Sequence, residues 1–204
     1  MNIIINEPFT AANFLAERAL SDGSSRDEVW EGVYIVSPIA NNDHQLILAR
    51  LLTALGSVLD FAAGAEVFQG VNVSDREDGW LQNYRIPDLA VVLPGSRARD
   101  CETHLCGGPD FLVEVLSRND LAREKREFYA EIGVREFLII DRDPWALELY
   151  RLDGAELNPV GRSTVEHPDL IVSEVLPLVL RMLPGEQRPR IEVRTTDGKQ
   201  AWNL

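Results

Sequence analysis

The chain has 204 residues, of which 45% are hydrophobic and 26% are charged, proportions that are typical of a soluble globular α/β protein. Its 20 basic and 33 acidic residues give a formal net charge of −13, which argues against a protein that wraps duplex nucleic acid with a broad basic face. A nuclease is not excluded, because a site that holds a divalent metal is itself acidic. No apolar run is long enough to span a membrane, and the first residues do not resemble a secretory signal. With only two cysteines, we expect a cytoplasmic protein.

The first half of the chain predicts helices and strands in alternation. Residues 10–21 are predicted as a short capped helix, and residues 28–36 as a strand or hairpin that turns at Glu31-Gly32. Leucines that recur on one face predict a long helix from residue 42 to about residue 62. Strands are then expected over residues 65–73 and 86–93.

The second half is strand-rich. An apolar strand over residues 111–116 is followed by an amphipathic helix over 120–132 and by a strand over 136–141. The two strands should be parallel and joined by a right-handed crossover. A further strand over 146–152 pairs with its predecessor, and the proline-rich remainder predicts short strands and irregular segments.

These elements predict one mixed α+β domain over residues 1–204. Its core is expected at about residues 27–152, with residues 153–204 as a C-terminal extension of strands and irregular segments.

Three charged residues lie where the pattern expects apolar ones. Lys125 falls in the middle of the apolar stripe of the 120–132 helix, and burying an ammonium without a partner is costly. Glu114 interrupts an otherwise apolar strand, and Asp88 stands at the start of another. Asp88 could equally be a turn residue after Pro87, and Glu114 could form an ion pair with Lys125 that only fixes the packing.

These three residue types suit hydrolysis of a phosphodiester. Carboxylate oxygens are hard ligands for Mg²⁺ or Mn²⁺, and magnesium often uses only one or two of them together with water. The metal would activate water and neutralise charge on a phosphate, and an ammonium nearby would orient the water or stabilise the transition state.

An ordered set of motifs resembles the Uma-two family of restriction-endonuclease-like proteins. The resemblance covers roughly residues 27–152 and implies the PD-(D/E)XK nuclease fold, a mixed central sheet flanked by helices with a metal site at the edge of the sheet. The matching residues are Glu28-Val29-Trp30-Glu31-Gly32, Ser37-Pro38, His44, Pro87-Asp88, Glu114-Val115-Leu116-Ser117, Lys125, Tyr129, Gly133-Val134 and the run 136–141.

The resemblance also implies roles for individual residues. Asp88 and Glu114 would be the two acids of the motif, and Asp88, Glu114 and Val115 would hold the metal. The commonest version has a lysine where this chain has Leu116, and the family supplies it from the following helix, which matches Lys125. Glu28 would be an additional catalytic acid.

For the other polar residues we expect a supporting role or none. Glu31 is a less favoured upstream acid, and it and His44 are candidates for supporting the site, although an inward histidine is more often a core or capping residue. Cys101, His104 and Cys106 are close enough in sequence for zinc, but they lack a fourth ligand, and an ordinary loop with free thiols fits better.

Two functions follow from these residues. The first is a magnesium- or manganese-dependent endonuclease that cleaves DNA and acts as a homodimer, since enzymes that cut a duplex often use two-fold symmetry. The second is a non-catalytic homodimeric interaction module, in which the acids and Lys125 form a structural ion-pair cluster. The second predicts that Lys125→Met is tolerated or stabilising and that divalent metal does not raise the melting temperature.

Overall fold

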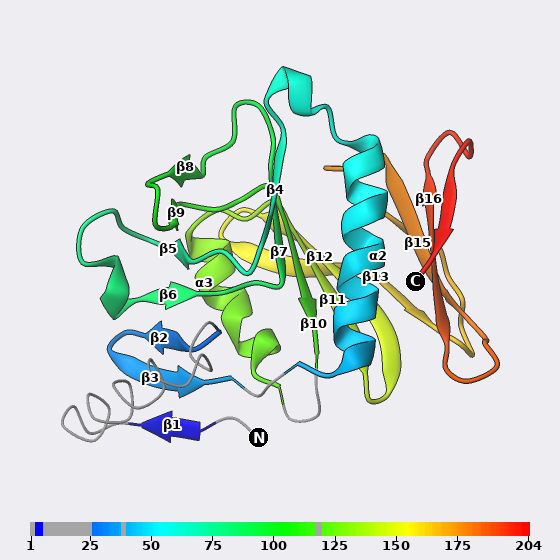
Figure 1. Cartoon of the computed structure of the whole chain (residues 1–204), viewed down its shortest axis with the longest axis horizontal. Helices are drawn as coiled ribbons and strands as arrows, with labels where there is room; N and C mark the ends of the chain where they lie inside the picture. Colours follow the sequence, from blue (N-terminus) through cyan, green and yellow to red (C-terminus); the bar gives the residue numbers. More distant parts are fainter. Residues whose placement is uncertain (1–2, 6–25, 38–39, 117–119) are drawn as a thin grey trace.

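The computed structural model describes residues 3–5, 26–37, 40–116 and 120–204 (Figure 1). The helix expected over residues 10–21 lies outside the described residues. No helix in the described part of the chain is long and apolar enough to cross a membrane.

A mixed six-stranded sheet forms the centre of the molecule (Figure 1). Strands β10 and β11 are parallel, as expected for the crossover unit, and every other neighbouring pair is antiparallel. The expected mixed sheet and the 146–152 hairpin strand are confirmed. In spatial order the strands are β13 (Glu156–Thr164), β12 (Trp145–Asp153), β11 (Glu136–Arg142), β10 (Phe111–Val115), β7 (Leu89–Val92) and β4 (Glu66–Gln69).

The two faces of this sheet are covered by different elements. Alternate side chains of a strand point to opposite faces, so Phe111, Val113 and Val115 join one core and Leu112 joins the other. Helix α2 (Asn42–Val58) packs on the first face through Ile47, Leu48, Leu51 and Leu55. The short helix α3 (Arg126–Glu131) covers the second (Figure 1).

A second sheet lies over the face that α3 covers. The expected hairpin at residues 28–36 is confirmed as β2 and β3, which turn at Glu31-Gly32. The order of this sheet is β1 (Ile3–Ile5), β3 (Val33–Val36), β2 (Glu28–Trp30), β6 (Tyr84–Arg85), β5 (Val73–Ser74), β9 (Leu105–Cys106) and β8 (Arg99–Asp100).

The strand expected over residues 65–73 is wrong as one element. The chain leaves β4 at Gln69, turns at Gly70 with a φ of +66°, and enters β5 in the other sheet. Apolar content alone cannot separate two short strands that belong to different sheets.

Two helices differ from the expected bounds. Helix α2 ends at Val58 rather than near residue 62, because Leu59 is extended and a separate 3₁₀ turn follows at Phe61–Ala63. The helix expected over 120–132 is a 3₁₀ turn, η3 (Ala122–Lys125), that continues into α3. A second 3₁₀ turn, η2, spans Trp80–Gln82.

The C-terminal region is more regular than its prolines indicate. Strand β13 completes one edge of the central sheet, and the other four strands form a third, antiparallel sheet. Its apolar residues, among them Leu180, Met182 and Val193, share the core beneath α2. The four strands are β14 (Ile171–Val172), β15 (Leu178–Leu183), β16 (Arg190–Thr195) and β17 (Ala201–Asn203).

Candidate active site

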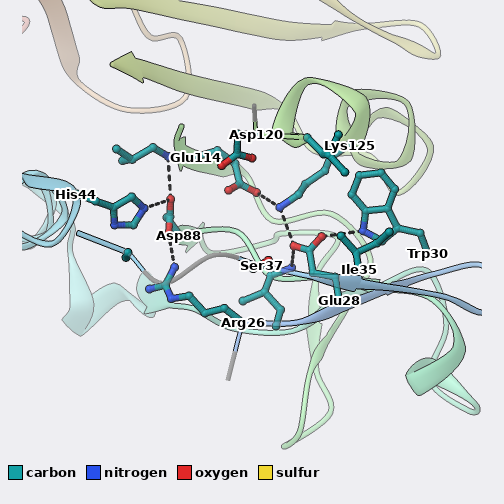
Figure 2. Close-up of a pocket in the computed structure, with 14 residues that line it drawn as sticks. Arg26, Glu28, Trp30, Ile35, Ser37, His44, Asp88, Glu114, Asp120 and Lys125 are labelled. Atoms are coloured by element: carbon teal, nitrogen blue, oxygen red, sulfur yellow. Dashed lines mark hydrogen bonds and ion pairs between the residues drawn. The ribbon is translucent and has the colours of Figure 1, made fainter. Parts of the chain in front are cut away.

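A cavity of about 50 Å³ lies where the start of β7 meets the end of β10. Five of the expected site residues line it together with Val115 (Figure 2), namely Glu28, His44, Asp88, Glu114 and Lys125. All five are at most 7% exposed. The structure therefore gathers side chains that lie as many as 97 residues apart in the sequence.

The strand register explains why the two acids meet. Strands β7 and β10 are antiparallel, with Leu89 opposite Val113. One step further along the same register, Asp88 comes opposite Glu114, and both point to the face that α3 covers. The backbone N–H of Val115 donates to Oδ2 of Asp88 at 2.8 Å, which ties the two positions together.

Lys125 joins two carboxylates. Its Nζ donates to Oε1 of Glu28 at 2.6 Å and to Oε1 of Glu114 at 2.8 Å. Tyr129, one helical turn further on, donates its hydroxyl to the same Oε1 of Glu114 at 3.0 Å. One turn of helix thus directs an ammonium and a phenol at one buried carboxylate.

Burial and charge set the protonation of this group. Burial raises the pKa of Glu114 to about 8, although Lys125 lowers it, and nearby Asp88 and Glu28 raise it further. Burial on its own lowers the pKa of Lys125, but the charges of Glu114 and Glu28 raise it overall, so the ammonium stays protonated. Burial also raises the pKa of Tyr129, and the phenol remains a hydrogen-bond donor.

Asp88 is held from three sides. Arg26 pairs with its Oδ1, whereas Nε2 of His44, at 3.0 Å, and the Val115 amide both contact Oδ2 (Figure 2). Burial raises the pKa of Asp88, but the bond from His44 and the charge of Arg26 hold it below its ordinary value. Asp88 is therefore an ionised carboxylate in the cavity wall.

Glu28 is fixed by the second sheet. Its Oε2 accepts from Nε1 of Trp30 at 2.7 Å, and its Oε1 accepts from the backbone N–H of Ile86 at 2.7 Å as well as from Lys125. Glu31, the less favoured upstream acid, is not brought to the cavity. It is exposed on the hairpin turn, with a φ of +47°, and its backbone N–H donates to Asn83.

Sequence reasoning missed Arg26 as a site residue and did not assign the bond from Tyr129. Arg26 precedes β2 without any apolar pattern around it, so no sequence signal marks it. The bond from Tyr129 could have been predicted from the sequence, because Tyr129 lies four residues after Lys125 on the same helical face and carries a hydroxyl.

The cavity residues fit a magnesium or manganese ion. Asp88 and Glu114 offer carboxylate oxygens on neighbouring strands. With Glu28 and Asp120, four carboxylates line the cavity, and the described residues that line it include two permanent cations, Arg26 and Lys125. The described residues contain no ready-made cluster of three acidic, histidine or cysteine ligands. Magnesium does not need one, because it commonly binds through one or two carboxylates and keeps several waters.

Cys101, His104 and Cys106 do not form a zinc site. Both ring nitrogens of His104 are already hydrogen-bonded, Nδ1 with Thr103 at 3.1 Å and Nε2 with the carbonyl of Arg76 at 3.0 Å. The ring also stacks on Trp80, with 4.8 Å between centroids. Both cysteines are free thiols, Cys101 in a loop and Cys106 buried in β9.

Comparisons with known proteins agree with this fold. A crystal structure described as "a putative nuclease belonging to DUF820 from Anabaena variabilis" aligns with a TM-score of 0.55 and 19% identity, over 72% of this chain and 80% of that one. The likeness confirms the expected restriction-endonuclease-like fold. No curated protein matches the chain. The model of the Uma2 family, described as "Putative restriction endonuclease", matches residues 17–184, and the chain therefore belongs to the Uma2 family.

Proposed function

We propose that this protein is a metal-dependent endonuclease that hydrolyses phosphodiester bonds of DNA. The observation that carries the proposal is the buried Glu114, which shares Lys125 with Glu28 and faces Asp88 across two neighbouring strands. Packing alone does not explain four carboxylates and two cations around one cavity, and such clusters concentrate at functional sites. Membership of the Uma2 family supports the assignment.

Asp88 and Glu114 would hold the metal. When bound, Mg²⁺ or Mn²⁺ would supply charge neutralisation at the phosphate and a more acidic water. Oε2 of Glu114 has no donor among the residues that the structure describes, so this oxygen is the one that Glu114 can offer. Val115, expected as a third ligand, lines the cavity, and its amide orients Asp88.

Lys125 acts as a charged donor rather than as a base. Its raised pKa keeps the ammonium protonated. Two of its three N–H groups bond Glu28 and Glu114, and within the described residues the third has no acceptor. That N–H is free to donate to the attacking water or to a phosphate oxygen that gains charge in the transition state.

The surrounding residues hold this donor in place. Trp30 and the Ile86 amide fix Glu28, which fixes Lys125, while Tyr129 fixes Glu114. Orientation before the reaction removes the cost of arranging these groups during it.

The test is cleavage of supercoiled, linear duplex and single-stranded DNA with Mg²⁺ or Mn²⁺. We expect cleavage by the wild type and a loss of about 100-fold or more in Glu114→Gln. The matched control is Glu148→Gln, which removes a carboxylate that pairs with Arg123 and does not line the cavity, and should cleave normally. Absence of cleavage by the wild type on every substrate, together with no binding of Mn²⁺, would rule the catalytic function out.

The alternative is a non-catalytic homodimeric module that retains this fold. The observation in its favour is that Lys125 is already neutralised by Glu28 and Glu114, so the cluster is stable without a ligand. Loss of Lys125 would leave two buried carboxylates without a cation, so we now expect Lys125→Met to destabilise the protein under either function, contrary to the tolerance that the sequence predicted for the module. The discriminating measurement is the melting temperature, which Mn²⁺ raises if the cavity binds metal and leaves unchanged if the cluster is only structural.

A further inference from the structure

The two cavity acids differ in how their oxygen atoms are occupied. Both bonds to Glu114 end on Oε1, which leaves Oε2 without a donor among the described residues. Both oxygens of Asp88 are occupied, because His44 and the Val115 amide contact Oδ2 and Arg26 pairs with Oδ1 (Figure 2). A metal that binds both acids therefore finds an oxygen without a donor at Glu114 and an oxygen paired with a guanidinium at Asp88.

Oδ1 is the oxygen of Asp88 that can become available to a metal. Oδ2 is held by two donors from buried elements, the helix α2 and the strand β10. Oδ1 is held by Arg26, whose side chain is 27% exposed, compared with 8% for Lys125. Moving Arg26 away breaks one ion pair at the rim of the cavity, whereas moving Lys125 would leave two buried carboxylates without a cation.

Arg26 and a divalent cation compete for Oδ1, because two positive charges at one oxygen repel each other. A guanidinium carries its charge at every accessible pH, so it cannot give way by losing a proton. It must move, and in doing so it becomes a cation released from Asp88 beside the metal. Its planar set of N–H donors matches the oxygens of a phosphate.

We propose that Arg26 is an exchangeable partner of Asp88. Without metal, Arg26 pairs with Oδ1 of Asp88. When a divalent metal binds that oxygen, Arg26 moves away and contacts the phosphate of the bound nucleic acid. Arg26 thus has two successive partners, the carboxylate of Asp88 without metal and the phosphate with it. The phosphate contact rests on the proposed function, whereas the exchange at Asp88 does not.

The exchange is tested without DNA, by calorimetric titration of Mn²⁺ into the full-length protein. Arg26→Met removes the competing charge, and we expect it to tighten Mn²⁺ binding by about tenfold or more. Arg26→Gln keeps an N–H donor for Asp88 without the charge, and should show the same effect if the methionine variant does not fold. The matched control is Arg135→Met, which takes an arginine from the buried Asp110 outside the cavity and should bind Mn²⁺ as the wild type does.

Unchanged or weaker Mn²⁺ binding in the folded Arg26 variants would overturn the exchange, as would absence of binding in every variant. Binding by the variants and not by the wild type would support it.

The phosphate contact is tested by fluorescence anisotropy of a labelled DNA duplex in saturating Ca²⁺ and in EDTA. We expect Arg26→Met to weaken binding by about fivefold or more in Ca²⁺ and to leave it unchanged in EDTA, where Arg26 is paired with Asp88. Equal binding by the variant and the wild type in Ca²⁺ would overturn this contact. If the wild type binds no DNA in Ca²⁺, the proposed function and the phosphate contact fail together, and the Mn²⁺ titration still decides the exchange.

Discussion

Lys125 connects two carboxylates of the site rather than forming a single ion pair. Its ammonium lies between Glu28, from the second sheet, and Glu114, from the central sheet, and so joins two layers of the fold. Burial raises the pKa of Glu114, and the charge of Lys125, which also serves Glu28, lowers it by less than burial raises it. The residue that identifies the site in the sequence therefore also controls its charge.

This arrangement predicts an unusual pH dependence. The pKa of Glu114 is raised from 4.5 to about 8 in the folded protein, so between these values the unfolded chain loses a proton that the folded protein keeps. The free energy of unfolding of the wild type should fall relative to that of Glu114→Gln by about 1.4 kcal/mol per pH unit over this window, and level off above it. Urea unfolding without metal, measured from pH 4 to pH 9, gives this difference.

Glu148, whose pKa is shifted in the opposite direction, provides the control. Burial raises the pKa of Glu148, but the bonds from Arg123 and Tyr150 hold it below its ordinary value, so it stabilises the folded state at neutral pH and stops doing so as the pH falls. The free energy of unfolding of the wild type relative to that of Glu148→Gln should therefore show no fall between pH 5 and pH 8. Parallel unfolding curves for the wild type and Glu114→Gln would contradict the assigned shift.

Among the elements, the first turn of α2 positions His44. Asn41 caps the helix by accepting the N–H of His44 at 3.0 Å, and its Oδ1 also accepts from Arg142 at 2.8 Å. Nε2 of His44 then reaches Asp88, while its buried Nδ1 has no partner among the described residues. The cap therefore connects the start of the helix to the wall of the cavity.

Asn41→Ala should affect both stability and the site. Loss of the cap is expected to lower the free energy of unfolding by about 1 kcal/mol. It should also weaken Mn²⁺ binding, because His44 no longer holds Asp88 at its present angle. The control is Asp60→Ala, which removes the cap of the 3₁₀ turn at Phe61–Ala63 and should leave metal affinity unchanged. Unfolding in urea and Mn²⁺ titration measure the two effects, and an Asn41→Ala variant with normal metal affinity would show that the cap does not position His44.

At the scale of the whole molecule, the C-terminal strands share a sheet and a hydrophobic core with the strands that form the site. Strand β13 pairs with β12 through eight residue pairs, and the third sheet places Leu180, Met182 and Val193 in the core beneath α2. The same core contains Val113 and Val115 of β10, which flank Glu114. Removal of these strands would expose the face of the sheet that supports the cavity.

A chain that ends at residue 152 is therefore expected not to fold cooperatively, even though the motifs end there. We expect it to lack a sigmoidal unfolding transition by circular dichroism and to bind a dye specific for exposed apolar surface, because it loses the third sheet and the apolar residues that this sheet places in the core beneath α2. The full-length chain is the reference. A cooperative transition in the shortened chain would show that residues 153–204 form a dispensable extension.

The sequence by itself determined which residues do not fit a simple core. Apolar runs interrupted by Asp88 and Glu114, and a lysine within a helical stripe, are local patterns, and burial of an ionised group is costly wherever it occurs. The same patterns determined the parallel pair β10 and β11, the hairpin at residues 28–36 and the long helix.

Only the tertiary structure decided which of these groups meet. Whether Glu28 or Glu31 reaches Lys125 depends on the pairing of β2 with β6, and the role of Arg26 depends on where the chain enters that sheet. The split of residues 65–73 between two sheets has the same origin. Contacts across 62 residues, as between Arg26 and Asp88, or 97, as between Glu28 and Lys125, are set by strand register and layer packing, which no local pattern encodes.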